Sequence, residues 1–262
     1  MTQPSNSKNK QRNLMPVIIG VVVGVTCFIL LQTASCCNVS CFLWNLNFAT
    51  LQGNGNLVTS KKPVTAFQKI HCAGSAEVRF HVSDEFQAVV TIDENLDEYV
   101  EIVAIHDVLN IGTKNGYSIS PTQFAVDVYC PVVTGVSISG SGSFGTEDTI
   151  IAPTFDSHVS GSGMIDGTVE CDHYSAVITG SGRITVSGKS DDASITVTGS
   201  GDFHGNDFNT RNATIAVTGS GNAHIGVADH IKARISGSGN VYYRGEPQID
   251  SSVSGSGRIS KR

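Results

Sequence analysis

The amino-acid sequence predicts an all-β protein whose body is a single-stranded parallel β-helix, or β-solenoid. The triplet Gly-Ser-Gly occurs seven times, and successive copies begin 18 to 21 residues apart. A fixed period of about 20 residues is typical of a solenoid. A β-branched residue stands two positions before every copy and an apolar residue two positions after it, whereas a flexible Gly-Ser linker has no reason to keep such columns. The triplets begin at Gly140, Gly161, Gly180, Gly199, Gly219, Gly237 and Gly255.

Length and charge limit the classes of function. The 262 residues suffice for one large or two ordinary domains. Six of the 17 basic residues and none of the 23 acidic residues lie in residues 1–76, so the rest of the chain has 11 basic and 23 acidic residues, a net charge of −12. Phosphate binding needs a cationic surface, so this acidic body excludes nucleic acid as a partner.

The chain begins with a predicted membrane anchor. Residues 1–13 form a polar cytoplasmic tail with three basic residues, and residues 14–32 follow as a transmembrane helix or signal anchor. The apolar run Leu14–Leu31 reaches about 27 Å at about 1.5 Å per residue, which spans the hydrocarbon core of a membrane. Basic residues keep the short N-terminal side in the cytoplasm. We therefore expect the remainder to lie outside it, in the periplasm or at the cell surface.

The residues after the apolar run leave two other ways of export open. Thr33-Ala34-Ser35-Cys36 is similar to a bacterial lipoprotein signal, in which small residues precede a cysteine that becomes lipidated. Thr33 stands where that signal usually carries Leu, so the match is partial. Lipidation of Cys36 and simple secretion are therefore alternatives to an uncleaved transmembrane helix.

The seven cysteines predict no metal site. Cys72, Cys130 and Cys171 are the three in the body, which has no Cys-x-x-Cys and no Cys/His pair at zinc spacing. Outside the cytoplasm, Cys72 and Cys130 can form a disulfide. The alternative that we favour is a pair of buried thiols.

Residues 33–62 are expected to be a linker, and residues 63–262 the folded domain. In residues 63–135, short β-branched or aromatic runs are separated by turn residues. Gly74-Ser75-Ala76 looks like a decayed copy of the triplet. We expect this region to form irregular opening coils that cover one end of the stack. Its predicted strands are Glu77–His81, Ala88–Asp93, Val100–Ile105, Val108–Gly112 and Phe124–Tyr129.

Residues 136–262 hold the seven repeats. Strand side chains alternate, so the positions four and two before the first glycine face the core, as does the apolar position two after the triplet. Glycine suits the corner because a sharp turn needs a positive φ and because backbones stacked about 4.8 Å apart leave little room for a Cβ. The Ser or Thr just before each triplet should form a hydrogen-bonded ladder between coils. We expect about three strands in each coil.

The repeat resembles a known bacterial family. The pattern Ser/Thr-Gly-Ser-Gly-x-apolar is similar to that of the putative auto-transporter adhesin, head GIN domain, as are the ending Ile235–Ile249 with Val253–Ile259 and the openings Val64–Ile70 and Asp93–Leu96. The resemblance covers roughly residues 53–262. It implies a right-handed β-helix on a cell-envelope protein, and it brings no binding residues to transfer.

The outward columns after the triplets supply the candidate binding residues. His204 and His224 occupy the third position after the triplet on adjacent coils, and Asp202 lies two residues before His204. Equivalent residues on adjacent coils are about 4.8 Å apart, so these side chains could ligate a metal or bind a sugar. The alternative is an ordinary solvated strand face. Because two histidines without a third ligand are insufficient, we predict no metal and no cofactor.

No catalytic residue is predicted. Ser, Thr and Asn dominate the outward columns, and no carboxylate pair recurs on adjacent coils. Gly-Ser-Gly followed by a strand also lacks the helix N-terminus on which phosphate binding depends. We therefore predict a non-catalytic adhesin or structural envelope module, tethered to the membrane, with a glycan or a surface protein as ligand. The alternatives are a polysaccharide-acting β-helix enzyme and an envelope-stress sensor that acts through a partner membrane protein.

Overall fold

The structure, a computed structural model, describes residues 50–262. These residues form 19 β-strands and one 3₁₀ helix, η1 (Glu94–Tyr99), so the all-β prediction is confirmed. No helix within this range is long and apolar enough to cross a membrane. The predicted tail (1–13), the predicted anchor helix (14–32) and Cys36 lie outside the described residues.

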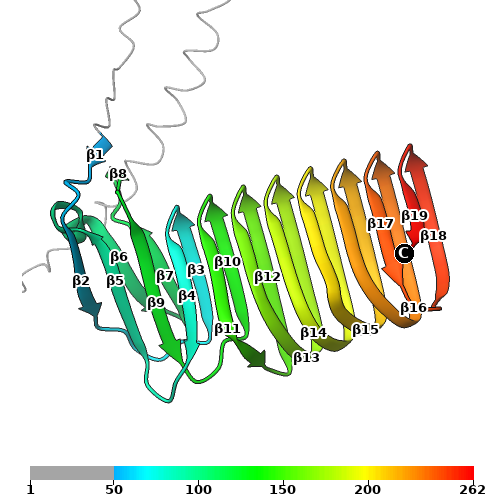
Figure 1. Ribbon diagram of the computed structural model, residues 1–262, viewed down its shortest axis with the longest axis horizontal. Coiled ribbons are helices and arrows are strands. Elements are labelled where there is room, and N and C mark those ends of the chain that lie inside the picture. The colour runs from blue at the N-terminus through cyan, green and yellow to red at the C-terminus, as the bar shows by residue number, and fades with distance from the viewer. Residues whose placement is uncertain (1–49) are drawn as a thin grey trace, which may run out of the picture. The chain divides into compact units, whose positions relative to one another are not determined.

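The repeats form a parallel β-solenoid of about seven turns (Figure 1). The first glycine of each triplet ends one strand, and the next strand begins directly after the triplet. Adjacent strands pair in parallel with the triplets in register, as Gly199 pairs with Gly180 and Gly219. The strands are β10 (Gly135–Gly140), β11 (Ser143–Ile151), β12 (Thr154–Gly161), β13 (Met164–Gly180), β14 (Arg183–Gly199), β15 (Asp202–Gly219), β16 (Asn222–Gly237), β17 (Asn240–Arg244), β18 (Gln248–Gly255) and β19 (Arg258–Lys261).

The middle coils differ from the expected three strands per coil. Each of β13 to β16 runs for 16 to 18 residues from one corner to the next without a break. The reason is that pairing with the neighbouring coils continues on both sides of the return bend. In β14 the alternation of buried and exposed residues fails at Asp191 and Asp192, both exposed, which indicates that the strand bends there.

The corner needs its two glycines for different reasons. Gly199 has a φ of 112°, and a Cβ on it would lie 2.5 Å from the carbonyl oxygen of Gly180. Gly201 has no positive φ, but a Cβ on it would lie 2.5 Å from the carbonyl oxygen of Gly182. Both requirements that we expected of the corner are therefore present: the first glycine meets both, and the second meets the close approach alone.

The three inward columns are buried in the first six repeats, as predicted. The β-branched column is at most 3% exposed in the first six repeats. In the last repeat Val253 is 42% exposed, because no further coil covers it among the described residues. Larger side chains fill the wider part of the middle coils, where the Tyr174 ring lies 4.8 Å from that of Phe208. The buried members of the β-branched column are Ile138, Val159, Ile178, Val197, Val217 and Ile235.

A further coil precedes the seven repeats. It consists of β3 (Lys69–Gly74) and β4 (Glu77–Val82), and Gly74 at its corner has a φ of 108°. Gly74 pairs with Gly140 although the two are 66 residues apart. Gly74-Ser75-Ala76 is thus a working corner, as its similarity to the triplet predicts.

The residues between this coil and the first repeat form a cap over its outer side (Figure 1). Two cap strands continue the parallel stack, because β7 pairs with β3 and β9 pairs with β4. The others are antiparallel: β5 pairs with β9, and β6 pairs with β7 in a hairpin. The expected irregular opening coils are therefore a mixed sheet. Its strands are β5 (Gln87–Asp93), β6 (Val100–Ile105), β7 (Val108–Thr113) and β9 (Phe124–Cys130).

The linker predicted over residues 33–62 is wrong for residues 50–62. Strand β1 (Thr50–Gln52) pairs with β8 (Ser118–Ser120), and β2 (Leu57–Lys62) pairs antiparallel with β5. The turn between β1 and β2 is held by Asp93, whose carboxylate accepts hydrogen bonds from the amides of Gly55 and Thr122, both at 2.7 Å. The sequence pattern did not predict these strands, because the side chain that holds the turn lies far away along the chain.

The cysteine and hydroxyl predictions have separate outcomes. Cys72 and Cys130 are free and buried, the favoured alternative, and burial raises the pKa of both thiols to about 11. The hydrogen-bonded hydroxyl ladder that we expected just before the corners is not formed in the described residues, and hydroxyl pairs form at other positions instead. Ser190 donates to Thr210 at 3.0 Å inside the solenoid, whereas Thr198 of the expected column is exposed.

Candidate functional site

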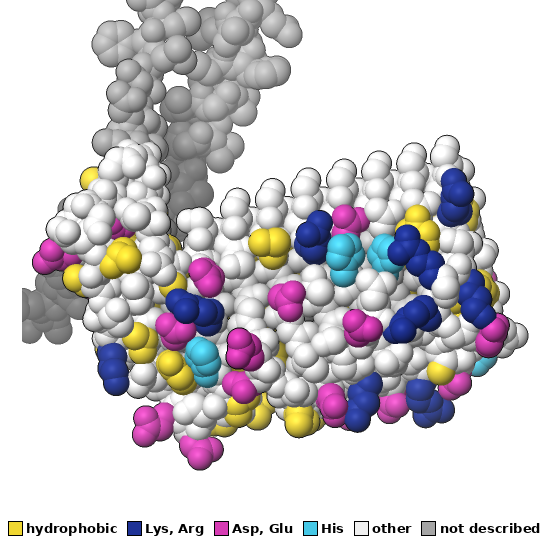
Figure 2. Space-filling model, viewed as in Figure 1, with side chains coloured by type: hydrophobic (Ala, Val, Ile, Leu, Met, Phe, Trp, Pro, Cys, Tyr) yellow, Lys and Arg dark blue, Asp and Glu magenta, His cyan; other side chains and the backbone are white. Residues whose placement is uncertain are grey.

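Two long walls of the solenoid carry the outward columns. We call the wall made by residues that follow each Gly-Ser-Gly the post-corner wall, and the wall made by residues that precede it the pre-corner wall. The predicted candidates Asp202, His204 and His224 are all on the post-corner wall, on β15 and β16. Figure 2 shows this wall, with two histidine side chains on adjacent coils.

The register of the parallel strands places the two histidines side by side, as the sequence predicts, and adds a further ring to form a row. His204 pairs with His224, and His224 pairs with Tyr242. The His204 and His224 ring centroids are 5.5 Å apart, edge to face, and the His224 and Tyr242 rings stack at 4.6 Å. The guanidinium carbon of Arg262 lies 4.3 Å from the centre of the Tyr242 ring. We call these four residues the ring strip.

A row of polar side chains runs beside the ring strip. The carboxylate of Asp202 accepts hydrogen bonds from the backbone amide of Asn222 at 3.0 Å and from its side-chain amide at 2.9 Å. The side-chain amide of Asn240 in turn donates to the side-chain oxygen of Asn222 at 3.0 Å. This amide ladder (Asp202, Asn222, Asn240) continues across three coils, so each group holds the next in place.

The middle of the ring strip is neutral at neutral pH. Burial lowers the pKa of His224, and the positive charge of Arg262 and the neighbouring His204 lower it further. The Nδ1 atom of His224 is shielded from solvent and has no hydrogen-bond partner. A neutral imidazole stacked on a phenol ring offers an aromatic face rather than a charge.

The ring strip does not form a coordination site. The described residues hold no group of three or more His, Cys, Asp or Glu side chains placed to bind a metal ion. Asp202, the predicted neighbour of the histidines, is engaged by Asn222 instead. The geometry therefore favours contact with rings and hydrogen-bonding groups over metal binding.

Two acidic residues of the return bends are paired with basic residues on adjacent coils. Asp192 lies 3.3 Å from His173, and Glu170 lies 3.1 Å from Lys189. All four side chains are at least 41% exposed. Such surface pairs contribute little and are typical of a solvated face.

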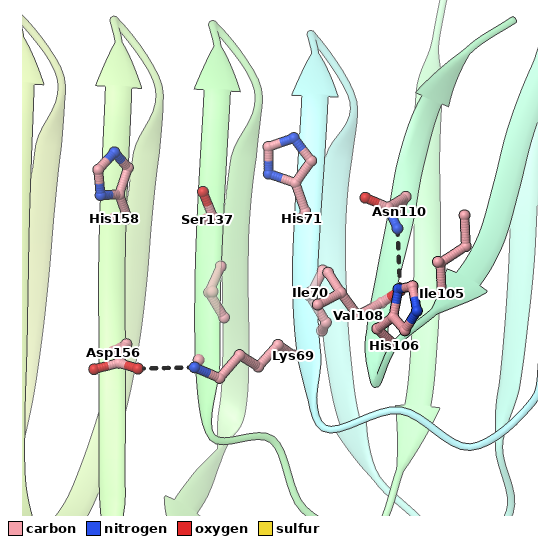
Figure 3. A pocket seen from close by; sticks show the side chains of 12 residues that line it. Lys69, Ile70, His71, Ile105, His106, Val108, Asn110, Ser137, Asp156 and His158 are labelled. Atoms are coloured by element: carbon pink, nitrogen blue, oxygen red, sulfur yellow. Dashed lines mark hydrogen bonds and ion pairs between the residues drawn. The ribbon is translucent and has the colours of Figure 1, made fainter.

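A groove opens on the pre-corner wall, where the first coils meet the cap. Its volume is about 590 Å³, within the usual range for ligand sites, about 300–1,000 Å³. Figure 3 shows His71, Ser137 and His158 side by side on β3, β10 and β12, which register places in one row. We call this space the junction groove. Its other labelled lining residues are Lys69, Ile70, Ile105, His106, Val108, Asn110 and Asp156.

The sequence reasoning missed the junction groove. His158 occupies the outward column three positions before the first glycine, and His71 holds the same place before Gly74. That column could have identified both histidines. Their wall partner His106 carries no such pattern, because it comes from the cap hairpin and reaches the groove only through tertiary folding.

Comparisons with known proteins agree with the resemblance seen in the sequence. Residues 66–247 match the family described as putative auto-transporter adhesin, head GIN domain. A solved structure named a putative lipid binding protein, from Parabacteroides distasonis, is 28% identical, with a TM-score of 0.69 over 81% of this chain and 99% of that chain. A putative adhesin from the same species is 25% identical, with a TM-score of 0.69 over 81% of this chain and 100% of that chain.

A putative adhesin from Bacteroides fragilis shares the fold at 19% identity, with a TM-score of 0.77 over 81% of this chain and 100% of that chain. Comparison with curated proteins gave no significant match.

Proposed function

This chain belongs to the head GIN domain family of putative auto-transporter adhesins, and on that premise we propose that it is an adhesive module held at a membrane and displayed outside the cytoplasm. The ring strip and the amide ladder are its contact face. The ligand is a glycan or a protein on another surface. The observation that carries this proposal is the row of ring contacts made by His204, His224 and Tyr242, which are half-exposed and lie beside Asn222.

The chemistry of this face suits recognition. Half-exposed aromatic rings supply contact area at a small cost in side-chain entropy, and amides donate and accept hydrogen bonds. Because interstrand register fixes the spacing, the face does not have to order itself on binding. Membership of an adhesin family supports the same use of the wall.

Attachment to a membrane rests on the sequence alone. The apolar run Leu14–Leu31 follows three basic residues and is long enough to span, and Cys36 offers lipidation as the alternative. We expect the full chain to fractionate with membranes. Globomycin treatment with mass spectrometry of the N-terminal peptide distinguishes the two anchors: an unprocessed chain in both conditions indicates the helix, and a lipidated Cys36 lost on treatment indicates the lipoprotein.

Adhesion is tested with the full chain in detergent micelles, captured on beads and offered glycans, matrix proteins and intact cells. Replacing His204 and Tyr242 by Ala should weaken binding at least about tenfold, since a few central ring contacts dominate an interface. Thr185→Ala is the matched control, because Thr185 occupies the same outward column one coil away. Equal losses in both variants, or no bound ligand for the wild type, would contradict the proposal. Release of reducing sugars from a bound glycan would favour the polysaccharide-acting enzyme instead.

A further inference from the structure

The junction groove exists because small residues on one strand lie between larger ones on both neighbours. On β10, Ser137 is half-buried, and Gly135 is buried beneath the side chains of its strand neighbours. Ser137 has His71 and His158 as its register partners, and Gly135 has Lys69 and Asp156. Because adjacent strands are about 4.8 Å apart, the two histidines are roughly 10 Å apart across Ser137, enough for one flat ring between or over them.

An ion pair forms the lower border of the groove. The ammonium of Lys69 reaches across Gly135 to the carboxylate of Asp156 at 3.0 Å (Figure 3). A Cβ on Gly135 would lie 3.6 Å from the Lys69 side chain and 3.3 Å from Asp156, so the lysine stem lies directly over this glycine. The pair places one positive and one negative side chain at this border, so the net charge of the border is zero.

The cap hairpin closes the side of the groove. The turn between β6 and β7 consists of His106 and Asp107, whose φ angles are 47° and 63°. The carbonyl oxygen of Asp107 accepts the amides of Gln68 at 2.9 Å and Lys69 at 3.0 Å, which ties the hairpin to the start of β3. This bond positions His106 and the half-exposed Ile105 beside the groove.

The lining groups both donate and accept hydrogen bonds. His71, His106 and His158 each offer ring nitrogens, and Ser137 offers a hydroxyl. The amide of Asn110 donates to the carbonyl oxygen of Val108 at 3.1 Å, which turns its own oxygen toward the groove as an acceptor (Figure 3). Ile105, 50% exposed, adds an apolar edge. This lining suits a ligand with hydroxyls around its rim and C–H groups on its faces. The hydroxyls would meet the uncharged hydrogen-bonding groups, and the C–H groups would meet the imidazole rings and the apolar edge.

We propose that the junction groove is a second binding site and that it takes a neutral sugar ring of a glycan. The site lies on the opposite wall from the ring strip and is built by different strands. This proposal rests on the proposed adhesive function in one respect: it names the chemical class of ligand for that function. An anionic ligand would meet the Asp156 carboxylate, and the described residues give a metal ion no third ligand here.

The test is binding of the full chain, in detergent micelles, to an array of neutral oligosaccharides and of sulfated and uronic-acid oligosaccharides of matched length. The wild type should bind neutral members. Ser137→Phe, which fills the floor from an outward position, should weaken that binding at least about tenfold. Thr196→Phe is the matched control, because it adds the same bulk in the same column on β14, away from the groove. It should bind as the wild type does.

A second variant tests the charge argument. Asp156→Asn leaves the Lys69 ammonium without its carboxylate, so binding should move toward uronic-acid oligosaccharides. Thermal unfolding curves of all variants verify that each is folded. Binding of charged members only by the wild type, or neutral binding that survives Ser137→Phe, would overturn the proposal.

The two proposals fail separately. Adhesion that depends on His204 and Tyr242 but neutral-sugar binding that ignores Ser137 would remove the groove site and keep the adhesive function. Neutral-sugar binding lost in Ser137→Phe, in a chain that adheres to no surface, would keep the groove site and remove the adhesive function.

Discussion

At the scale of single residues, the corner glycines determine whether coils can stack. The first glycine combines a positive φ with a close approach to the corner below, and the second has the close approach alone. In the next corner, the amides of Ser220 and Gly221 both donate to the carbonyl oxygen of Gly199. A side chain at either glycine would push the coils apart at the point where these bonds form.

Replacing Gly199 by Ala should destabilise the protein by at least about 2 kcal/mol, since it adds backbone strain to a clash with Gly180. Gly145→Ala is the control, because Gly145 has no positive φ and nothing lies within 4 Å of its Cβ position. Its effect should stay within about 0.5 kcal/mol. Urea unfolding curves measure both, and equal midpoints for the two variants would refute this role of the corner.

Asp93 is the other residue with a large local effect, and it makes stability depend on pH. Burial alone would raise the pKa of this carboxyl, but hydrogen bonds from Thr122 and Gly55 outweigh burial and lower it. A lowered pKa in the folded state means that the contribution is present above the unfolded-state value of about 3.9 and is lost as pH falls through the folded value.

Asp93→Asn should therefore lower the melting temperature at neutral pH, because the Thr122 amide loses a charged acceptor. The difference from the wild type should shrink as pH falls below about 4, where the unfolded chain takes up the proton first, and should be lost below the lowered folded-state pKa, where the native carboxyl also loses its charge. Melting temperatures from pH 7 downward measure this. A difference that stays constant with pH would show that Asp93 acts through packing rather than charge.

At the scale of elements, each middle coil is one long strand that bends around an apolar interior. Aromatic side chains fill the wider part of that interior. Tyr174 is central, with its ring 6.1 Å from Phe203 and its hydroxyl donating to Ser157 at 3.1 Å. Because adjacent coils share these side chains, a coil cannot lose its filling without exposing its neighbours.

Phe203→Asp should unfold several coils. The loss should exceed the roughly 3–5 kcal/mol typical of Phe→Ala, since it adds an unpaired buried charge to a cavity. Thr198→Asp places the same charge at an exposed position of the strand before it and should cost no more than about 0.5 kcal/mol. Circular dichroism during urea unfolding compares them. An unchanged curve for Phe203→Asp would contradict the inward assignment of its column.

At the scale of the whole described molecule, the two ends of the stack differ. The first end is covered by the cap, and β3 and β4 lie between that cap and the repeats. At the last coil, β18 is exposed along its full length. Terminal repeats of a solenoid fray when nothing covers them, whereas covered coils share the stability of the stack.

The rate of amide hydrogen exchange should therefore differ between the covered and the uncovered end of the stack. Amides of β4, β9 and β14 should be the slowest, and those of β18 and β19 the fastest, because the latter can open without disturbing the core. Exchange measured by mass spectrometry after peptic digestion resolves these segments. Slow exchange in β18 equal to that in β14 would indicate that another surface covers this end in solution.

The sequence by itself determined the features that repeat or alternate locally. The Gly-Ser-Gly period gives the corners, and alternation gives the inward columns and cap strands such as Val100–Ile105, which the structure reproduces without change. Register then follows from the period, so His204 beside His224 was predictable. Tertiary structure alone decided the pairing of Gly74 with Gly140, the fold of residues 50–62 and the junction groove. The physical reason is that these contacts join segments far apart in the chain, and no local pattern records which distant backbone will supply a strand's hydrogen bonds.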